Sequence, residues 1–199
     1  MTELLSDPAY RHVLLNHFPV IGLSIAFAVL VIGAVFRQTA MLFTGLVLVA
    51  LAAGASLPVG IYGNDAYPAV FDRLDGDGRA WLDYHMSLAD TWLPVLYTNA
   101  VLAVIALGVG ILRPPLLLPA AMLVTLVTLA GIGTAFAIAN AGGKVMHPEF
   151  RLIDPPVVES SRRLRSSTKY GAGYRPGYDR SSCCRDPRRP LPVVHSPYR

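Results

Sequence analysis

The chain contains 199 residues, of which 53% are hydrophobic and only 15% are charged, and its formal net charge is +4. So few polar side chains cannot enclose several long apolar helices, which argues against an ordinary soluble domain. The charge is also uneven: residues 1–159 contain seven Lys or Arg and eleven Asp or Glu, whereas residues 160–199 contain ten and two. The chain therefore divides into an apolar, acidic part and a basic tail.

Four stretches of the first part are long and apolar enough to cross a bilayer, which takes about 20 helical residues. The predicted spans are residues 17–36, 40–61, 91–112 and 116–141. A helix at the surface of a soluble core carries a polar stripe, whereas these stretches are apolar on all sides. The first is too long for the apolar part of a signal peptide, so we interpret it as a retained helix. We expect residues 1–154 to form an all-α, integral membrane four-helix domain.

The connections between the spans predict the topology. Arg37–Thr39 and Arg113–Pro115 are short turns, which make consecutive helices antiparallel neighbours in an up-down bundle. The long acidic connection, roughly Tyr62 to Asp90, then lies on the opposite side together with both termini. The basic turns favour the cytoplasm, although the other side carries more Lys and Arg in total. We predict a multi-pass membrane protein with its termini on the non-cytoplasmic side.

Residues 155–199 form a tail rich in Arg, Ser and Pro. It has too little apolar surface to offset the entropy of ordering, so we expect disorder. Its basic side chains suit contact with anionic lipid headgroups rather than specific nucleic acid. The alternatives are a solvated extension without a role, or a frameshift product. Cys183 and Cys184 are adjacent and form no CxxC motif, which argues against covalently attached haem and thiolate zinc sites.

Three histidines are predicted to lie at one face of the bilayer. His17 begins the first span, His85 precedes the third and His147 follows the fourth. Neutral imidazole is a common ligand of haem iron, copper and zinc. The simpler alternative is that histidines near lipid headgroups have no role. His12 and His195 lie in flanks that we expect to be exposed.

The residues around these histidines resemble a bacterial family of small four-helix membrane proteins, the DUF2231-type uncharacterised membrane proteins. The shared motifs are Asn16-His17-x-Pro19, Tyr62-Gly63-x-x-Ala66, His85-x-x-x-Ala89 and Gly142-Gly143-x-x-x-His147-Pro148-Glu149. The resemblance covers about residues 10–151, and the long tail departs from it. It implies a location in the bacterial inner membrane, and haem b or metal binding by the recurring membrane histidines. From the residues alone, the double glycine is typical of a helix end in left-handed geometry.

We therefore predict a membrane protein that binds haem b or a transition metal and acts in electron transfer, with a redox partner or a second copy of itself. His17, His85 and His147 are the candidate cofactor ligands, and Glu149 joins them if the cofactor is a bare metal ion. Asn16 and Asp90 are expected to orient these ligands.

Two other functions stay open: a small transporter or channel-like protein, and a structural membrane subunit without a cofactor. No Ser-His-Asp order, Walker loop, GxGxxG or HExxH motif is present in the sequence, so we leave catalysis open and favour a non-enzymatic role.

Overall fold

The structure is a computed structural model that describes residues 5–156 and 158. The prediction of an all-α fold is confirmed, because the described residues form helices and no strand. The helices are α2 (Pro8–Leu15), η1 (Phe18–Gly22), α3 (Leu23–Val35), α4 (Thr39–Gly54), α5 (Ser56–Arg73), α6 (Gly76–Leu112), η2 (Pro114–Leu116), α7 (Leu117–Met146) and η3 (Pro148–Phe150). The predictions for the basic tail and its cysteines fall outside the described residues.

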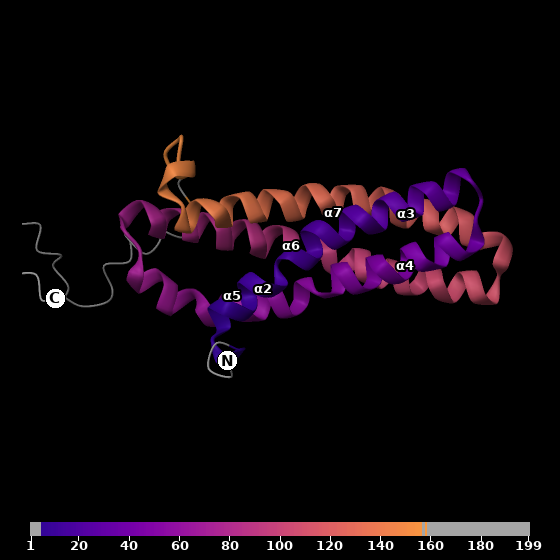
Figure 1. The fold of residues 1–199 in the computed structure, drawn as a ribbon, viewed down its shortest axis with the longest axis horizontal. Helices are drawn as coiled ribbons and strands as arrows, with labels where there is room; N and C mark the ends of the chain where they lie inside the picture. Colours follow the sequence, from indigo (N-terminus) through magenta and orange to yellow (C-terminus); the bar gives the residue numbers. More distant parts are fainter. Residues whose placement is uncertain (1–4, 157, 159–199) are drawn as a thin grey trace, which may run out of the picture.

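These helices join into four segments that are each long and apolar enough to cross a membrane. The segments are Pro8–Val35, Thr39–Arg73, Gly76–Leu112 and Pro114–Met146. All four extend beyond the predicted apolar spans at the end where the histidines lie. The α3–α4 and α6–α7 turns lie together at one end of the molecule, and the α5–α6 junction and the end of α7 lie at the other, which we call the open end (Figure 1).

The long acidic connection expected between the second and third spans, roughly Tyr62 to Asp90, is almost entirely helical in the structure. Only Leu74 and Asp75 separate α5 from α6. Asp75 caps the new helix, because its carboxylate accepts a hydrogen bond from the Gly78 N–H at 2.6 Å. Acidic side chains in a first helical turn also interact favourably with the helix dipole, and Asp77 lies there. A capped start of this kind lets a charged segment remain helical outside the apolar stretch.

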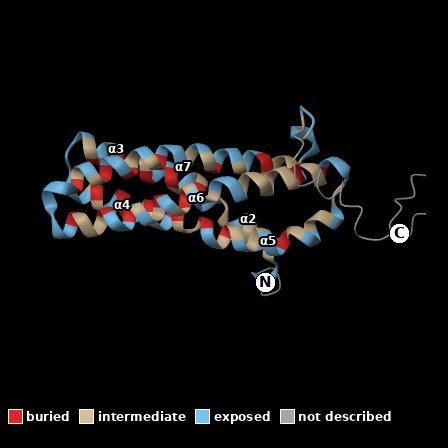
Figure 2. Cartoon of the chain, turned by 180° about the vertical axis from the view of Figure 1, so that it is seen from behind, coloured by how far each residue is buried: buried red, intermediate tan, exposed pale blue. Residues whose placement is uncertain are grey.

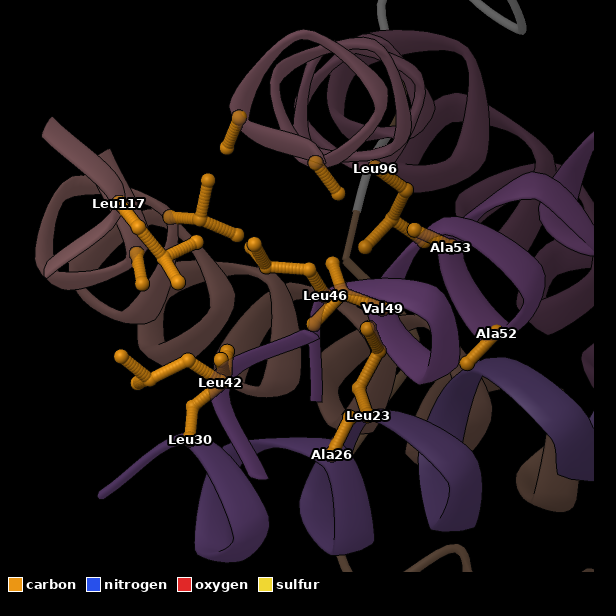
Figure 3. Close-up of a cluster of buried hydrophobic side chains, with 14 of the residues drawn as sticks. Leu23, Ala26, Leu30, Leu42, Leu46, Val49, Ala52, Ala53, Leu96 and Leu117 are labelled. Atoms are coloured by element: carbon orange, nitrogen blue, oxygen red, sulfur yellow. The ribbon is translucent and has the colours of Figure 1, made fainter. Parts of the chain in front are cut away.

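The hydrophobic core lies between α3, α4, α6 and α7. Leu23, Leu30, Leu46, Leu96 and Val124 are buried there almost completely, and most of them are labelled in Figure 3. Figure 2 shows buried positions facing inward and exposed positions covering the outside of the helices. The outside is also apolar, since many exposed residues are Ile, Leu, Val or Phe.

Glycines allow the first two long helices to approach closely. A Cβ atom added at Gly22 would lie 2.8 Å from the Ala52 Cβ, and one at Gly45 would lie 2.7 Å from Leu30 side-chain atoms. Carbon atoms pack at about 3.5–4.0 Å, so neither position has room for a side chain unless its neighbours move. Helix α3 therefore packs directly on the backbone of α4.

One polar pair lies inside the core. Asn99 of α6 and Thr128 of α7 are completely buried, and the Asn99 Nδ2 donates to the Thr128 Oγ1 at 3.2 Å. The Thr128 hydroxyl donates in turn to the Val124 carbonyl at 2.8 Å. Hydrogen bonds between apolar helices contribute about 0.6 kcal/mol each on average. The pair therefore fixes the register of α6 on α7 at a modest energetic contribution.

Arg151 connects the end of α7 to the start of α6 through hydrogen bonds. The Arg151 side chain is only 9% exposed, and its guanidinium donates to both carboxylate oxygens of Asp75 at 3.0 and 3.1 Å. It also donates to the carbonyls of Lys144 and Val145, each at 2.7 Å. Those carbonyls lie in the last turn of α7 and lack helical partners. Arg151 thus satisfies one helix end while it binds the cap of another.

We expect Gly45→Ala to destabilise the protein and Gly108→Ala to leave it unchanged or slightly more stable. Overpacking typically costs about 1–3 kcal/mol, which exceeds the gain of up to about 1 kcal/mol from replacing a helical glycine by alanine. Gly108 is the matched control, since a Cβ there would meet nothing within 4 Å. Thermal unfolding of both variants in the same detergent tests this. Equal midpoints would contradict the close packing of α3 on α4.

We also expect the contribution of Asp75 to stability to disappear in acid. The Gly78 N–H and the Arg151 guanidinium hold the pKa of Asp75 below its usual 3.8. The stabilisation is therefore fully present above pH 3.8 and is lost as the pH falls through the lower pKa of the folded state. Asp75→Asn keeps a capping side chain and removes the charge. Its deficit in melting temperature against the wild type should be present at pH 7 and should shrink towards pH 3, whereas a constant deficit would contradict the ion pair.

Candidate functional site

Two histidine rings meet near the open end of the molecule. His12 lies on α2 and His85 on α6, with ring centres 6.2 Å apart and ring planes at 87°. Both side chains are half-buried. The prediction that His12 lies in an exposed flank is therefore wrong. The reason is an earlier helix start: Asp7 accepts a hydrogen bond from the Ala9 N–H at 2.9 Å, and Pro8 occupies the first helical position.

Each ring is held in the same way by a neighbouring helix. The His12 Nδ1 lies 2.9 Å from the Val59 carbonyl oxygen of α5, and the His85 Nδ1 lies 2.9 Å from the Ile138 carbonyl oxygen of α7. In both cases a glycine follows the accepting residue by four positions: Gly63 follows Val59, and Gly142 follows Ile138. We call each set of histidine, carbonyl and glycine a histidine seat.

The glycine makes each seat accessible. In an α-helix the N–H four residues after a carbonyl points at that carbonyl, so the residue at this position lies directly beside it. A Cβ added at Gly63 would lie 2.9 Å from the His12 Nδ1, and one at Gly142 would lie 3.1 Å from the His85 Cε1. A side chain at Gly63 would force the His12 ring to move, and one at Gly142 would press against the His85 ring.

The seats determine which ring nitrogen carries the proton. A carbonyl oxygen can only accept a hydrogen bond, so the Nδ1 of each ring must be the donor. In the neutral ring the Nε2 then has no proton and presents a lone pair. Metal-ligating histidines have this arrangement, since the second ring nitrogen usually donates to a carbonyl or a carboxylate. Both rings are therefore prepared to donate electron pairs through Nε2.

The double glycine does not end the fourth helix, which corrects the expected left-handed cap. Helix α7 continues to Met146, and none of the glycines in residues 5–156 has a positive φ. Gly142 instead contacts the His85 ring. A Cβ at Gly143 would meet nothing within 4 Å.

The other candidate site residues lie elsewhere. The exposed His17 bonds to its own helix, with Nδ1 2.9 Å from the Val13 carbonyl oxygen. The exposed His147 lies 2.9 Å from the Glu149 carboxylate, beyond the end of α7. Asn16 is half-buried and Asp90 is exposed. Within the described residues, no group of three or more His, Cys, Asp or Glu side chains could hold a metal ion.

The histidine seats lie between two hydrophobic clusters along the helices. The main core ends before them, and a second cluster around Trp81, Leu82 and Val145 follows towards the open end. Two contacts between α5 and α6 involve residues close to the seats in the sequence. At one, a Cβ at Gly60 would lie 3.2 Å from the Tyr97 hydroxyl, and at the other the Tyr67 hydroxyl donates to the Asp83 carboxylate at 2.6 Å. Helix α5 therefore packs against α6 near the histidine seats.

No family model, curated protein or solved structure matches the chain. The similarity to the DUF2231-type family therefore stays a prediction.

We expect Gly142→Ala to lower the melting temperature clearly more than Gly143→Ala. The added methyl group at position 142 meets the His85 ring, and the displaced Nδ1–H loses its acceptor, whereas the methyl group at position 143 enters open space. An unsatisfied buried polar group costs about 1–3 kcal/mol. The two positions are adjacent on one helix, so helix propensity cancels in the comparison. Equal melting temperatures would show that the seat of His85 does not need the glycine.

Proposed function

We propose that this chain is a multi-pass membrane protein that holds a metal cofactor, either haem b or a transition-metal ion, between His12 and His85 and uses it in electron transfer. The observation that carries the proposal is the repeated histidine seat, because it orients two rings with Nδ1 protonated and Nε2 available as a ligand. His85 is retained from the sequence prediction, and His12 takes the place given there to His17 and His147.

Insertion of an up-down four-helix bundle into the bacterial inner membrane is part of the proposal. It is supported by the four long apolar segments and by the apolar outer surface, on which Ile25, Val101 and Leu126 are all exposed. In water this surface would be costly, whereas in lipid it is the expected exterior. The side on which the termini lie stays a prediction.

The position of the histidines also favours a cofactor. Polar rings placed between apolar helices cost free energy unless they are hydrogen bonded. Here each ring satisfies one nitrogen and leaves the second without a proton. A bound metal ion would complete the coordination of both Nε2 atoms and offset the remaining cost. Near the end of the bundle, such a cofactor would be within reach of a redox partner at one membrane surface.

The test is the cofactor content of the purified full-length protein. With haem precursors and metals supplied during expression, we expect a stoichiometric cofactor in the wild type and a loss of at least about tenfold in His12→Ala and His85→Ala. His17→Ala and His147→Ala are matched controls and should keep the wild-type content. A wild type with neither a haem absorption band nor a stoichiometric metal would overturn the proposal and favour a structural subunit or a transporter.

A further inference from the structure

We infer that the cofactor is haem b and that His12 and His85 are its two equivalent axial ligands, contributed by two repeats of one helical hairpin. This inference rests on the proposed function and specifies its ligand.

The chain contains the same hairpin twice. The first runs from Pro8 to Arg73 with its turn at Arg37–Thr39, and the second runs from Gly76 to Met146 with its turn at Arg113–Leu116. In each, the histidine lies on the first arm near the open end, and the seat carbonyl and glycine lie on the second arm. His12 and His85 precede their turns by similar lengths of chain, as Gly63 and Gly142 follow theirs. The two hairpins therefore share the order of histidine, carbonyl and glycine along the chain, their spacing from the turn, and the atoms that form the hydrogen bond.

A second glycine recurs at the turn end of each hairpin. A Cβ at Gly33 would lie 3.1 Å from the Leu42 backbone nitrogen, and one at Gly110 would lie 2.6 Å from the Leu117 side chain. Each glycine lies just before its turn and allows the two arms to close on one another. The two hairpins therefore resemble each other both at the turn and at the open end.

The contacts between the hairpins are those of a two-fold arrangement. In such an arrangement the first arm of each hairpin packs against the second arm of the other. The first arm α3 packs against α7, and the second arm α4 packs against α6. Both hairpins have their turns at the same end (Figure 1). We infer an approximate two-fold axis along the bundle, across which the two histidine seats correspond.

The number of ligands selects haem over a bare ion. A metal ion bound by protein alone usually takes three or four protein ligands. The seats supply two, from His12 and His85. A haem iron receives four nitrogens from the porphyrin and needs only two axial ligands from the protein. Two symmetric imidazoles satisfy the iron of a haem completely.

The separation of the rings agrees with this assignment. With metal–nitrogen bonds of about 2 Å on opposite sides of one ion, two imidazole centres lie roughly 6 Å apart. The observed ring centres are 6.2 Å apart.

The experiment uses the full-length protein purified with haem supplied, measured by absorption and electron paramagnetic resonance. The wild type should show a six-coordinate, low-spin signal. His12→Ala and His85→Ala should each lose most of their haem and to the same extent, the haem that remains should be five-coordinate and high-spin, and added imidazole should restore the low-spin signal. His17→Ala and His147→Ala should keep the wild-type signal. If an alanine variant does not fold, His85→Met and His12→Met keep an axial ligand and should shift the spectrum instead.

Each of the other possible results contradicts a specific part of this inference. A stoichiometric metal ion that depends on His12 and His85, without haem, would contradict the haem assignment and leave the proposed function intact. Haem that depends on only one of the two histidines would contradict their equivalence. A wild type that takes up neither haem nor metal would overturn the proposed function itself. Rings that merely form an aromatic pair would give this last result.

Discussion

The arrangement of this protein depends on one constraint at the open end: an imidazole N–H between apolar helices must find a carbonyl, and helical carbonyls are normally covered. His12 and His85 reach the carbonyls of Val59 and Ile138 because the residue one helical turn later is glycine. The constraint explains why Gly63 and Gly142 occur inside helices, where glycine is otherwise unfavourable. It also fixes the direction of both rings, since only the Nδ1 can donate, and leaves both Nε2 atoms for a ligand.

Each of the two helical hairpins contains one histidine seat, so the local hydrogen bonding recurs with the architecture. Each hairpin closes tightly at its turn, where a glycine meets the opposite arm, and holds its histidine near the other end. Two such hairpins packed first arm against second arm bring the histidines together without a direct bond between them. Beyond the seats, Asp75 and Arg151 tie α6 to α7 at the open end. The proposed cofactor thus lies where two copies of a simple unit meet.

Hydropathy predicted the helical class and the four long segments because lipid-length apolar stretches are a local property of the sequence. His85 was also predicted, but its partner was not. His12 was judged by its distance from the first apolar stretch, although Asp7 and Pro8 together are a recognisable signal for a helix start. Gly142 was interpreted as a helix end because its actual contact, the His85 ring, comes from a different helix. The segment from Tyr62 to Asp90 was predicted only as an acidic connection between spans, although Asp75 is a capping signal for the start of a helix. The contact of Gly142 lies between helices, which periodicity along one chain does not describe, whereas the caps at Asp7 and Asp75 are local signals that hydropathy does not register.

The most direct test of the histidine seats is nitrogen NMR of the cofactor-free protein labelled with ¹⁵N-histidine, with each signal assigned by single His→Ala variants. The chemical shifts report which nitrogen of each ring carries the proton. The neutral form of both His12 and His85 should carry its proton on Nδ1 and have a bare Nε2. A proton on Nε2 of either ring, or fast exchange between the two forms as for a ring in water, would contradict the seats and the site built from them.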